Sequence, residues 1–368
     1  ELQIPKDLPS FEMPDIKSRI GDILLGGLLA PTIALGRRLG LFEALAAVGS
    51  KETPADPEAI ANHAGCKPRF VREWLGAMAC GGLIQVTEDE KFYMEPEIVQ
   101  EFIDYSNLEV AMMDMIPNAI KTFDELAYVF KKDGPPGLRY EQFCGFYQAM
   151  DGLTRAMHDK HLLSNYFPYI GMDDKLKAGG LKILDVGCGS GYHAIMMAKA
   201  FPGCEVTAVD ISPAAIELAE KQLAAETTPL NNLKFHVMDA GHMSAEWTQT
   251  FDFITIYDAC HDQCRPDLCI QEIHRLLKPN GVFAMLEIRG SSSIYTDAKE
   301  NPAFSSAFYS ISMFHCLAVG SNDPNALGMG AMWGVRRAEQ LLRASGFSDI
   351  RVLHPEFFLP NVVYVCTK

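Results

Sequence analysis

A glycine-rich turn in the second half of the chain is the first feature whose residue types predict chemistry. The segment ILDVGCGSGYHA ends an apolar run at Val186 and then places glycines at Gly187, Gly189 and Gly191. Glycine lets the backbone approach a ligand closely and turn tightly into a following helix. Such a turn after a strand suits a nucleotide-like ligand, and by itself it fits the pyrophosphate of a dinucleotide equally well.

Two aspartates that follow the turn are placed to contact the same ligand. Asp210 ends the apolar run EVTAVD, about 20 residues beyond the turn, and Asp239 ends the run LKFHVMD. The first carboxylate can accept hydrogen bonds from ribose hydroxyls, and the second can accept from an adenine amino group. Alternatively, each aspartate caps the helix that follows it. Because both lie in register with the glycine turn, we interpret them as ligand-binding residues. We add three neighbours of the strand ends to the predicted cofactor site: Ile211, Ala240 and Tyr257.

Short apolar runs that alternate with helical stretches must position this turn. From Leu181 onward, five runs read as strands: KILDVG, EVTAVD, LKFHVM, FDFITIYD and VFAMLE. Alternating strands and helices predict a parallel sheet with helices on both faces, which binds ligands at the carboxyl ends of its strands. Residues 289–334 interrupt the rhythm, and a helical run and the strand-like runs DIRVLH and NVVYVCTK follow. The sequence therefore predicts an α/β fold for this half.

Residues 181–287 resemble the class I S-adenosylmethionine (SAM)-dependent methyltransferases. The hallmark loop E/D-x-G-x-G-x-G is matched from Asp185 to Gly191, and Asp210, Asp239 and LLKPNGVFAMLE also match. The resemblance implies SAM as cofactor and a Rossmann-like seven-stranded sheet whose last strand, NVVYVCTK, is antiparallel. It also implies that the glycines frame the methionine part of SAM, that Asp185 supports its amino group, and that the later acids hold ribose and adenine.

The first half of the chain has a different, mostly helical pattern over residues 16–100. The order helix, turn, helix, LIQV and KFYMEP is typical of a winged helix with its hairpin. LGLFEALA and RFVREWLGAMACGGLI resemble the small-molecule O-methyltransferases that carry an N-terminal winged-helix dimerisation domain. FYQAM resembles their Phe-x-x-Ala-Met segment, which implies that Phe146 and Met150 contact the substrate. The resemblance further implies a homodimer formed through this half.

Composition limits the partners that we expect. The chain has 368 residues and a formal net charge of −15, which repels phosphate backbones. A winged helix can bind DNA, but this charge and the lack of a clearly basic recognition helix argue against nucleic acid. Ten scattered cysteines favour a reducing cytosol, and the N-terminus lacks a secretory pattern. The apolar run Ile23 to Leu35 is too short for a membrane span and is predicted to be a buried helix. We therefore expect a cytoplasmic protein without a membrane partner.

His261, in YDACHDQCRPD after the fourth predicted strand, is the main candidate for acid–base chemistry. Methyl transfer is an in-line displacement in which the enzyme mainly aligns the nucleophile. A hydroxyl nucleophile must also lose its proton, and an imidazole accepts it best near neutral pH. In the resembling O-methyltransferases a His-Asp pair at this place carries the base, which implies His261 with Asp262. An acid on the fifth strand usually orients the histidine, and Glu287 lies at that position.

The resemblance around His261 is partial. Gln263 stands where the family usually has Trp, and GAMWG stands where a second acid is expected before the last helix. The alternative is that His261 is a polar helix cap. Cys260, Cys264 and Cys269 lie close to the histidine in sequence, but their spacing is not that of a zinc knuckle, so no metal is predicted.

Residues 289–334 are predicted to form a lid over an apolar acceptor pocket. The segment SSAFYSISMFHCL gathers aromatic and methionine side chains around His315, a second base candidate that has no acid near it in sequence. Plain core packing explains these residues equally well. The predicted substrate contacts of this region are Phe308, Phe314, His315 and Trp333.

These features divide the chain and predict its function. We expect a winged-helix domain over residues 1–100, a helical linker and substrate-pocket region over 101–175, and a SAM-binding domain over 176–368. The predicted function is transfer of the SAM methyl group to a small molecule, at oxygen with His261 as general base. One alternative is a sulfur or nitrogen acceptor, because a thiolate or free amine needs little help from a base. Another is a noncatalytic SAM-fold protein or a winged-helix regulator.

Overall fold

The computed structural model of the chain describes residues 15–103, 107–143 and 145–368, without the side chains of residues 146–149 and 156. By its internal contacts the chain forms two units, Glu1–Pro117 and Asn118–Lys368. The three-part division expected from the sequence stays a prediction.

The first unit has the predicted winged-helix order of elements, with three short helices before a two-stranded antiparallel hairpin. Two of these helices begin at a proline, which is preorganised for a first helical position. Phe42 is fully buried and contacts the rings of Trp74 and Phe102, at centroid distances of 4.9 and 4.8 Å. The elements are α1 (Ile16–Arg38), α2 (Leu41–Val48), α3 (Pro57–Ala64), α4 (Pro68–Cys80), β1 (Gln85–Val86), β2 (Phe92–Tyr93) and α5 (Pro96–Ile103), and α6 (Leu108–Lys121) leads into the second unit.

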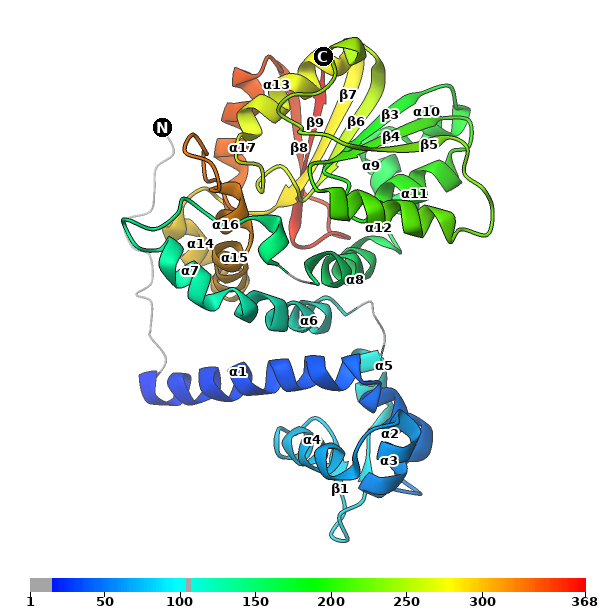
Figure 1. Ribbon diagram of the computed structural model, residues 1–368, viewed down its shortest axis with the longest axis vertical. Coiled ribbons are helices and arrows are strands. Elements are labelled where there is room, and N and C mark those ends of the chain that lie inside the picture. Colours follow the sequence, from blue (N-terminus) through cyan, green and yellow to red (C-terminus); the bar gives the residue numbers. More distant parts are fainter. Residues whose placement is uncertain (1–14, 104–106, 144) are drawn as a thin grey trace. The chain divides into compact units, whose positions relative to one another are not determined.

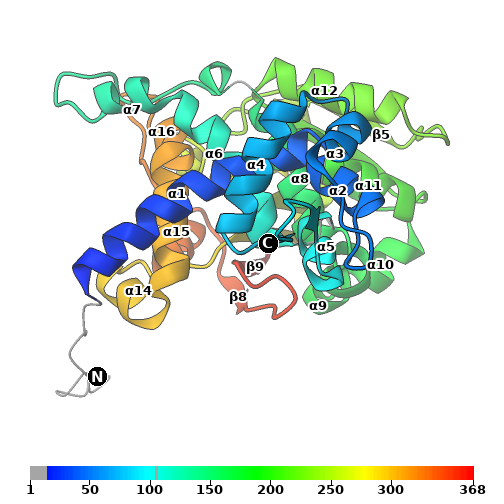
Figure 2. The ribbon, with the colours of Figure 1, turned by 90° about the horizontal axis from the view of Figure 1, so that it is seen from below.

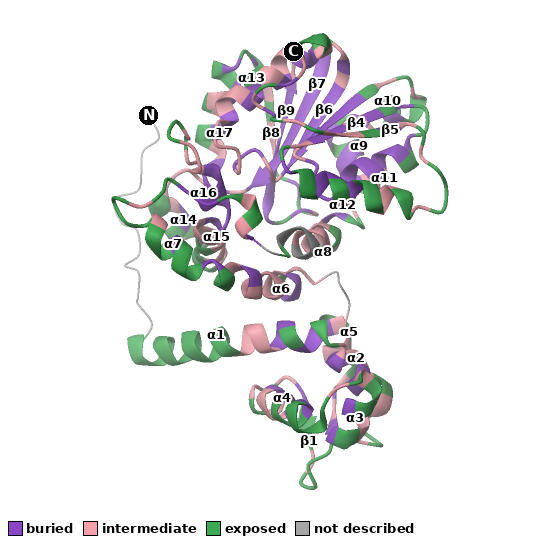
Figure 3. Ribbon diagram, in the orientation of Figure 1, coloured by how far each residue is buried: buried purple, intermediate pink, exposed green. Residues whose placement is uncertain are grey.

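Helix α1 corrects the prediction of a buried helix at Ile23 to Leu35. The helix is longer than that run, with 23 residues, and its N-terminal half is exposed (Figure 3). Only its C-terminal part is held within the unit, where Trp74 Nε1 donates to the Thr32 carbonyl at 3.1 Å. Among the described residues, α1 is the one helix long and apolar enough to cross a membrane, and one such helix near an N-terminus is weak evidence for a span. The first part of the run is exposed, whereas Ile33 and Ala34 near its end are buried, with Ile33 in the core of the unit.

The second unit contains the predicted seven-stranded sheet, in the order β5-β4-β3-β6-β7-β9-β8 (Figure 1). The last strand is antiparallel to both of its neighbours, and the pairs among the first five strands in this order are parallel. This confirms the predicted fold class. The strands are β3 (Lys182–Val186), β4 (Glu205–Asp210), β5 (Leu233–Val237), β6 (Phe251–Tyr257), β7 (Leu277–Ile288), β8 (Asp349–Leu353) and β9 (Asn361–Thr367).

Helices cover both faces of this sheet, and the strands are therefore apolar on both sides. Ile183 points into a core shared with α9, α10 and α11, whereas its neighbour Leu184 points into a core shared with α13 and α17. The second unit's helices are α7 (Phe123–Val129), α8 (Phe146–His158), α9 (Phe167–Ile170), α10 (Asp173–Ala178), α11 (Tyr192–Ala200), α12 (Pro213–Ala224), α13 (Pro266–Leu276), α14 (Ile294–Glu300), α15 (Pro302–Phe314), α16 (Cys316–Gly320) and α17 (Gly334–Ala344).

The segment expected to interrupt the alternation is helical. Residues 289–334 contain α14, α15 and α16, which lie together at one end of the unit in both views (Figures 1 and 2). Phe123 at the start of α7 packs on Phe314 of α15 with a centroid distance of 6.5 Å. This group of helices stands beyond the carboxyl ends of the strands, where the glycine turn also lies.

Candidate active site

A cavity of about 880 Å³, partly open to solvent, lies at the carboxyl ends of β3, β4 and β6. Its wall combines the glycine turn after β3 with residues that end the next two strands in the sheet. Eight of the sequence-predicted site residues line it: Met150, Gly187, Gly189, Asp210, Ile211, Ala240, Tyr257 and Asp262. The fold thus gathers residues that are far apart in the sequence, because parallel strands present their carboxyl ends at one edge.

The glycine turn adopts a backbone that only glycine tolerates at low cost. Gly187, Gly189 and Gly191 have φ of 69°, 53° and 81°, in the left-handed region. A Cβ at Gly191 would lie 2.7 Å from the ring of Phe235. Gly191 is thus the glycine that lets α11 pack closely on the sheet, while the cavity is lined by the other two.

Asp210 is held by two backbone N–H groups. Gly189 donates to its Oδ2 and Ser212 to its Oδ1, both at 2.9 Å. Burial raises the pKa of this carboxyl, and these hydrogen bonds act against the rise. The alternative, that Asp210 caps the next helix, is therefore partly correct, because it accepts from the N–H of Ser212, the residue that precedes α12. A carboxylate offers about four lone-pair sites, so capacity remains for hydroxyl donors from the cavity.

Asp185, on β3 below the turn, is 1% exposed, and neither carboxylate oxygen has a hydrogen-bond partner among the described residues. Burial, with Asp210 adding to it, raises the pKa of this carboxyl well above its usual range. An unpaired buried carboxylate is costly to leave without a donor. Asp185 lies behind the cavity wall and not in it, and its unpaired oxygens fit a positively charged ligand group, such as an ammonium, that reaches past the turn.

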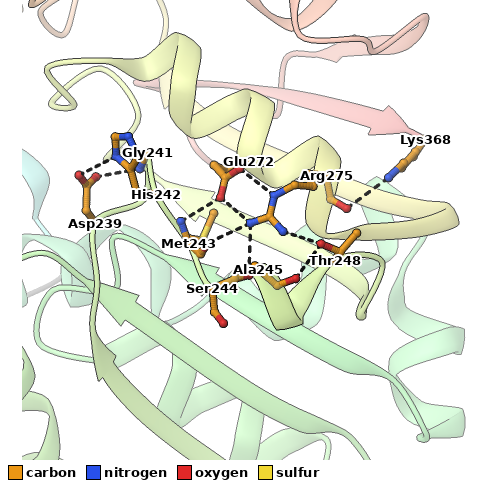
Figure 4. A network of polar contacts seen from close by, with 10 residues as sticks. All are labelled: Asp239, Gly241, His242, Met243, Ser244, Ala245, Thr248, Glu272, Arg275 and Lys368. Carbon is orange, nitrogen blue, oxygen red and sulfur yellow. Dashed lines mark hydrogen bonds and ion pairs between the residues drawn. The ribbon is translucent and has the colours of Figure 1, made fainter.

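Asp239 lies outside this cavity, in the wall of a neighbouring one that shares Ile211 and Asp262 with it. Its Oδ1 accepts from the Gly241 N–H at 2.8 Å, and its Oδ2 lies 3.3 Å from His242 Nδ1 (Figure 4). The side chain is half exposed, so both interactions leave it accessible to a ligand.

The segment after Asp239 is tied down by a second polar network (Figure 4). Arg275 on α13 donates to the Met243 carbonyl at 2.9 Å, and Glu272 accepts from the Met243 N–H at 2.9 Å. Glu272 and Arg275 are also paired with each other. This network fixes the chain that carries Asp239 and Ala240 past the end of β5.

His261 and Glu287 form a buried pair at the ends of β6 and β7. The imidazole Nδ1 lies 2.5 Å from Glu287 Oε2, and Oε1 accepts from the backbone N–H groups of Cys260 and His261 at 3.0 and 3.3 Å. The two side chains are 3% and 0% exposed. Burial acts to lower the pKa of His261, but Glu287 and then Asp262 outweigh it and raise that pKa well above 6.5. Glu287, the acid expected from the sequence to orient the histidine, therefore contacts the ring directly.

The other ring nitrogen of His261 faces Asp262 and a cysteine from a distant segment. Nε2 lies 3.3 Å from Asp262 Oδ1, and the Cys316 thiol of α16 lies beside the imidazole. His261, Asp262 and Cys316 each offer one possible ligand atom, all within 4.8 Å of one another. Sequence reasoning considered Cys260, Cys264 and Cys269 instead. It had no signal for Cys316, which reaches the site only through the helical insertion.

The remaining predicted substrate residues are scattered. His315 is 6% exposed, with Nδ1 3.8 Å from Asp262 Oδ2, and burial lowers its pKa to about 4. Phe308 packs on Phe304 at a centroid distance of 4.4 Å, and Phe314 packs on α7. Trp333 is 1% exposed in the core beside α17. The side chain of Phe146 lies outside the described part of the chain, although the residue begins α8.

The cavity wall also contains residues that sequence reasoning passed over. His193 stacks on Tyr257 at 3.9 Å between ring centroids and bonds to His158 at 2.8 Å. Asp258 follows Tyr257 with φ of 46°, and Asn361 of β9 donates to its two oxygens at 2.8 and 3.0 Å. The only available signal for Asp258 was its place at the end of a predicted strand.

Comparisons with known proteins match both halves of the chain to known domains. Residues 177–323 match the family model described as a methyltransferase domain, and residues 27–103 match an Rv2258c-like winged HTH domain. The chain is 35% identical to the mitochondrial ubiquinone biosynthesis O-methyltransferase of Schizosaccharomyces pombe, over 30% of this chain and 38% of that protein. It is 31% identical to the ubiquinone biosynthesis O-methyltransferase of Xanthomonas oryzae pv. oryzae, over 29% of this chain and 43% of that protein. The chain thus spans less than half of the length of these relatives.

Solved structures share the fold over almost the whole chain. Mitomycin 7-O-methyltransferase MmcR matches with a TM-score of 0.69 and 18% identity, covering 96% of this chain and 98% of that one. Human N-acetylserotonin methyltransferase in complex with SAM matches with a TM-score of 0.68 and 15% identity, covering 97% and 99%. PigF with SAH matches with a TM-score of 0.69 and 17% identity, covering 96% and 100%. At these identities the likeness is one of fold.

Proposed function

We propose that this chain, which contains a methyltransferase domain preceded by a winged helix-turn-helix domain, transfers the methyl group of SAM to a hydroxyl of a small molecule. The observation that carries the proposal is that the glycine turn, the unpaired carboxylate of Asp185 and the His261–Glu287 pair occur at one edge of one sheet. The first two suit a donor that carries an ammonium group, and the pair suits removal of a proton.

The residues present fit SAM as the donor. Asp185 would accept from its ammonium group, Asp210 from the ribose hydroxyls and Asp239 from the adenine amino group, with Ile211 and Ala240 against the adenine ring. Gly187 and Gly189 leave room for the methionine part because they line the cavity without side chains. When bound, SAM supplies an electrophilic methyl group at a sulfonium centre. The chain's own task is then to align the acceptor and to remove its proton.

His261 is proposed to accept the proton of the acceptor hydroxyl at Nε2. Glu287 holds the proton of Nδ1, which leaves the lone pair on Nε2, and it stabilises the imidazolium that forms. Because His261 does not itself line the cavity whereas Asp262 does, the acceptor reaches Nε2 along the Asp262 side. Catalysis requires the neutral imidazole, and the raised pKa of His261 therefore predicts an enzyme that works better above neutral pH.

The acceptor pocket and the assembly are also proposals. Met150 lines the cavity, and we assign Phe146, Phe308, Phe314, His315 and Trp333 to the acceptor side or its packing layer. The apolar surface of α1 supports a homodimer sealed through the first unit, because exposed apolar surface of this extent marks an interaction site. A cytoplasmic location and the absence of a nucleic-acid partner follow from composition alone and remain proposals.

The test combines SAM binding with methyl transfer. Calorimetry should detect SAM binding by the wild-type chain, and labelled SAM should report transfer to a panel of phenols, thiols and amines. His261→Ala should lower turnover on a hydroxyl by about 10²–10⁴-fold while leaving SAM affinity nearly unchanged. His274→Ala, at a histidine on α13 outside the cavity, is the matched control.

Three results separate the alternatives. A thiol acceptor ionises near pH 8.5 unaided, so His261→Ala would keep most of its activity at high pH if sulfur is the natural nucleophile. A chain that binds DNA and not SAM would be a regulator. If the mutant binds SAM and methylates its hydroxyl substrate at the parental rate, His261 is a cap and not a base.

A further inference from the structure

The charge of the cavity wall is uneven. Four carboxylates line it: Asp151, Asp210, Asp258 and Asp262. Among the described residues of this wall none is Lys or Arg. Two of the four already have partners, because Asp151 pairs with Arg155 at 2.8 Å and Asp210 accepts two backbone N–H groups. The carboxylates left to act on an acceptor are Asp258 and Asp262.

Asp258 differs from Asp262 in what surrounds it. Asp262 faces the two histidines His261 and His315, so the proposed proton transfer already accounts for it. Asp258 forms no ion pair, although the charge of His261 favours its ionised form, and the amide of Asn361 holds its carboxylate in place from β9. Burial, with the charge of Glu287 added, raises its pKa to about 7. Such a carboxyl gains from any donor or cation that enters the cavity.

The backbone at Asp258 is also held in an uncommon conformation. Its φ of 46° lies in the left-handed region, which non-glycine residues seldom adopt. The Asp258 N–H donates to the Leu286 carbonyl of β7 at 2.9 Å, so the strand ends in a fixed turn. Asp258 lines the cavity, while both of its carboxylate oxygens accept from Asn361 of β9 at the edge of the sheet. A fixed, buttressed carboxylate beside the proposed base is an arrangement that selects a ligand by charge.

We infer that Asp258 is a specificity-determining residue for the acceptor, and that it binds a cationic or N–H-donating group of that molecule. The site then disfavours acceptors that carry a carboxylate or phosphate at the same position. This inference rests on the proposed methyl transfer, and it narrows the acceptor class from any small hydroxyl compound to amine-bearing or neutral ones. Arg139 and Arg265 line the neighbouring cavity and not the one that Asp258 lines.

The test uses three catechols of similar size, with an aminoethyl, a hydroxyethyl or a carboxymethyl side chain. Their binding to the full-length protein is measured by calorimetry with S-adenosylhomocysteine present, and their methylation is measured with labelled SAM. The wild type should bind the amine at least about tenfold more tightly than the carboxylate. Asp258→Asn should bring the affinities for the amine and the carboxylate close together, and its effect on methylation should fall chiefly on KM. Binding and methylation of the hydroxyethyl compound should stay nearly unchanged.

The variants are chosen to separate recognition from folding. Asn keeps the shape of Asp and tolerates a left-handed backbone, and Asp258→Gly relieves that backbone while removing the carboxylate. Asp323→Asn, on the outer cavity wall, is the control and should keep the amine preference. Equal or weaker binding of the amine by the wild type, or an amine preference that survives both Asp258 variants, would overturn the inference. So would a loss of S-adenosylhomocysteine affinity in the Asp258 variants, which would assign the residue to the donor.

Failure of the proposed function has a different signature. Binding of the amine that depends on Asp258, without methyl transfer from SAM to any of the three catechols or to the wider panel, would refute the reaction and leave the recognition intact. Transfer to the hydroxyethyl and carboxymethyl compounds as fast as to the amine would support the reaction and refute recognition by Asp258.

Discussion

Replacing Glu287 with Gln removes one charge from the proposed base pair while nearly keeping its shape. Glu287 Oε1 accepts from two backbone N–H groups, and Oε2 faces His261 Nδ1. The amide has only one oxygen. Turning it away from the backbone would leave two buried N–H groups unsatisfied, at about 1–3 kcal/mol each, so the oxygen should stay on the backbone. The NH₂ group then faces Nδ1, and the neutral ring must carry its proton on Nε2.

This change of tautomer predicts a large loss of rate. A ring protonated at Nε2 cannot accept the acceptor's proton there, so kcat on a hydroxyl should fall by about 10²–10⁴-fold, the usual contribution of a general base. Removing the carboxylate should also lower the pKa of His261, because burial then acts without its main opposing charge. The acidic limb of the pH–rate profile should therefore move to lower pH while its plateau drops.

Stability gives an independent reading of the same variant. Because the folded-state pKa of His261 is raised, its pairing with Glu287 stabilises the fold fully below the unfolded value of about 6.5 and is lost as the pH rises through the folded value. Breaking a buried pair costs about 3–5 kcal/mol when a charge is left behind. Because Gln keeps neutral hydrogen bonds, we expect Glu287→Gln to lower the free energy of unfolding by about 1–3 kcal/mol near pH 6 and by less near pH 9.

The assay is single-turnover methyl transfer across pH, with thermal melts at pH 6 and pH 9. Asp252→Asn is the matched control, since Asp252 also accepts a backbone N–H, from Lys182 at 2.9 Å, and pairs with Lys278, away from the cavity wall. It should lower the melting temperature without changing kcat or the acidic limb. Parental turnover with an unshifted limb in Glu287→Gln would show that the pair is structural and that the reasoning about the tautomer is wrong.

Three further outcomes are expected. Asp210→Ala should weaken SAM binding more than tenfold in calorimetry, because hydrogen bonds to a charged group contribute about 1.5–3 kcal/mol each, and unchanged affinity would show that the donor is misplaced. Gly191→Ala should lower the melting temperature much more than Gly180→Ala, since both have left-handed φ but only the first Cβ would clash, 2.7 Å from Phe235. Light scattering at micromolar concentration should give about twice the chain mass of 40.7 kDa, and a monomer mass would rule out the homodimer.

The sheet and the part of the cavity wall formed by the glycine turn and Asp210 could be predicted from the sequence for a physical reason. Strands buried on both faces read as continuous apolar runs, and residues at their carboxyl ends are brought together by parallel pairing alone. Gly187 and Asp210 could be placed in one site from these two rules before any contact was known.

The surroundings of His261 and Asp258 were harder to predict, because they depend on segments whose packing the local sequence pattern does not encode. Cys316 reaches His261 through the helical insertion, and Asn361 reaches Asp258 through the antiparallel pairing of β9 with β7. Neither pairing has a periodic signal. Trp333 illustrates the opposite error. It was assigned to the substrate because it is an aromatic residue near the predicted lid, but it packs in the core. Helix α1 was mistaken for core because an apolar run does not state which surface covers it.

The surroundings of His261 predict how a bound acceptor should change its titration. At a pH where the ring is protonated, Nδ1 faces Glu287 Oε2 and Nε2 lies 3.3 Å from Asp262 Oδ1, so both carboxylates favour the imidazolium. Within the described part of the chain, that Asp262 oxygen has no hydrogen-bond partner. Once Nε2 loses its proton, it can accept a hydrogen bond from an acceptor hydroxyl that enters along the Asp262 side. Because such a hydrogen bond favours the neutral ring, a bound hydroxyl should shift the acidic limb of the pH profile toward lower pH.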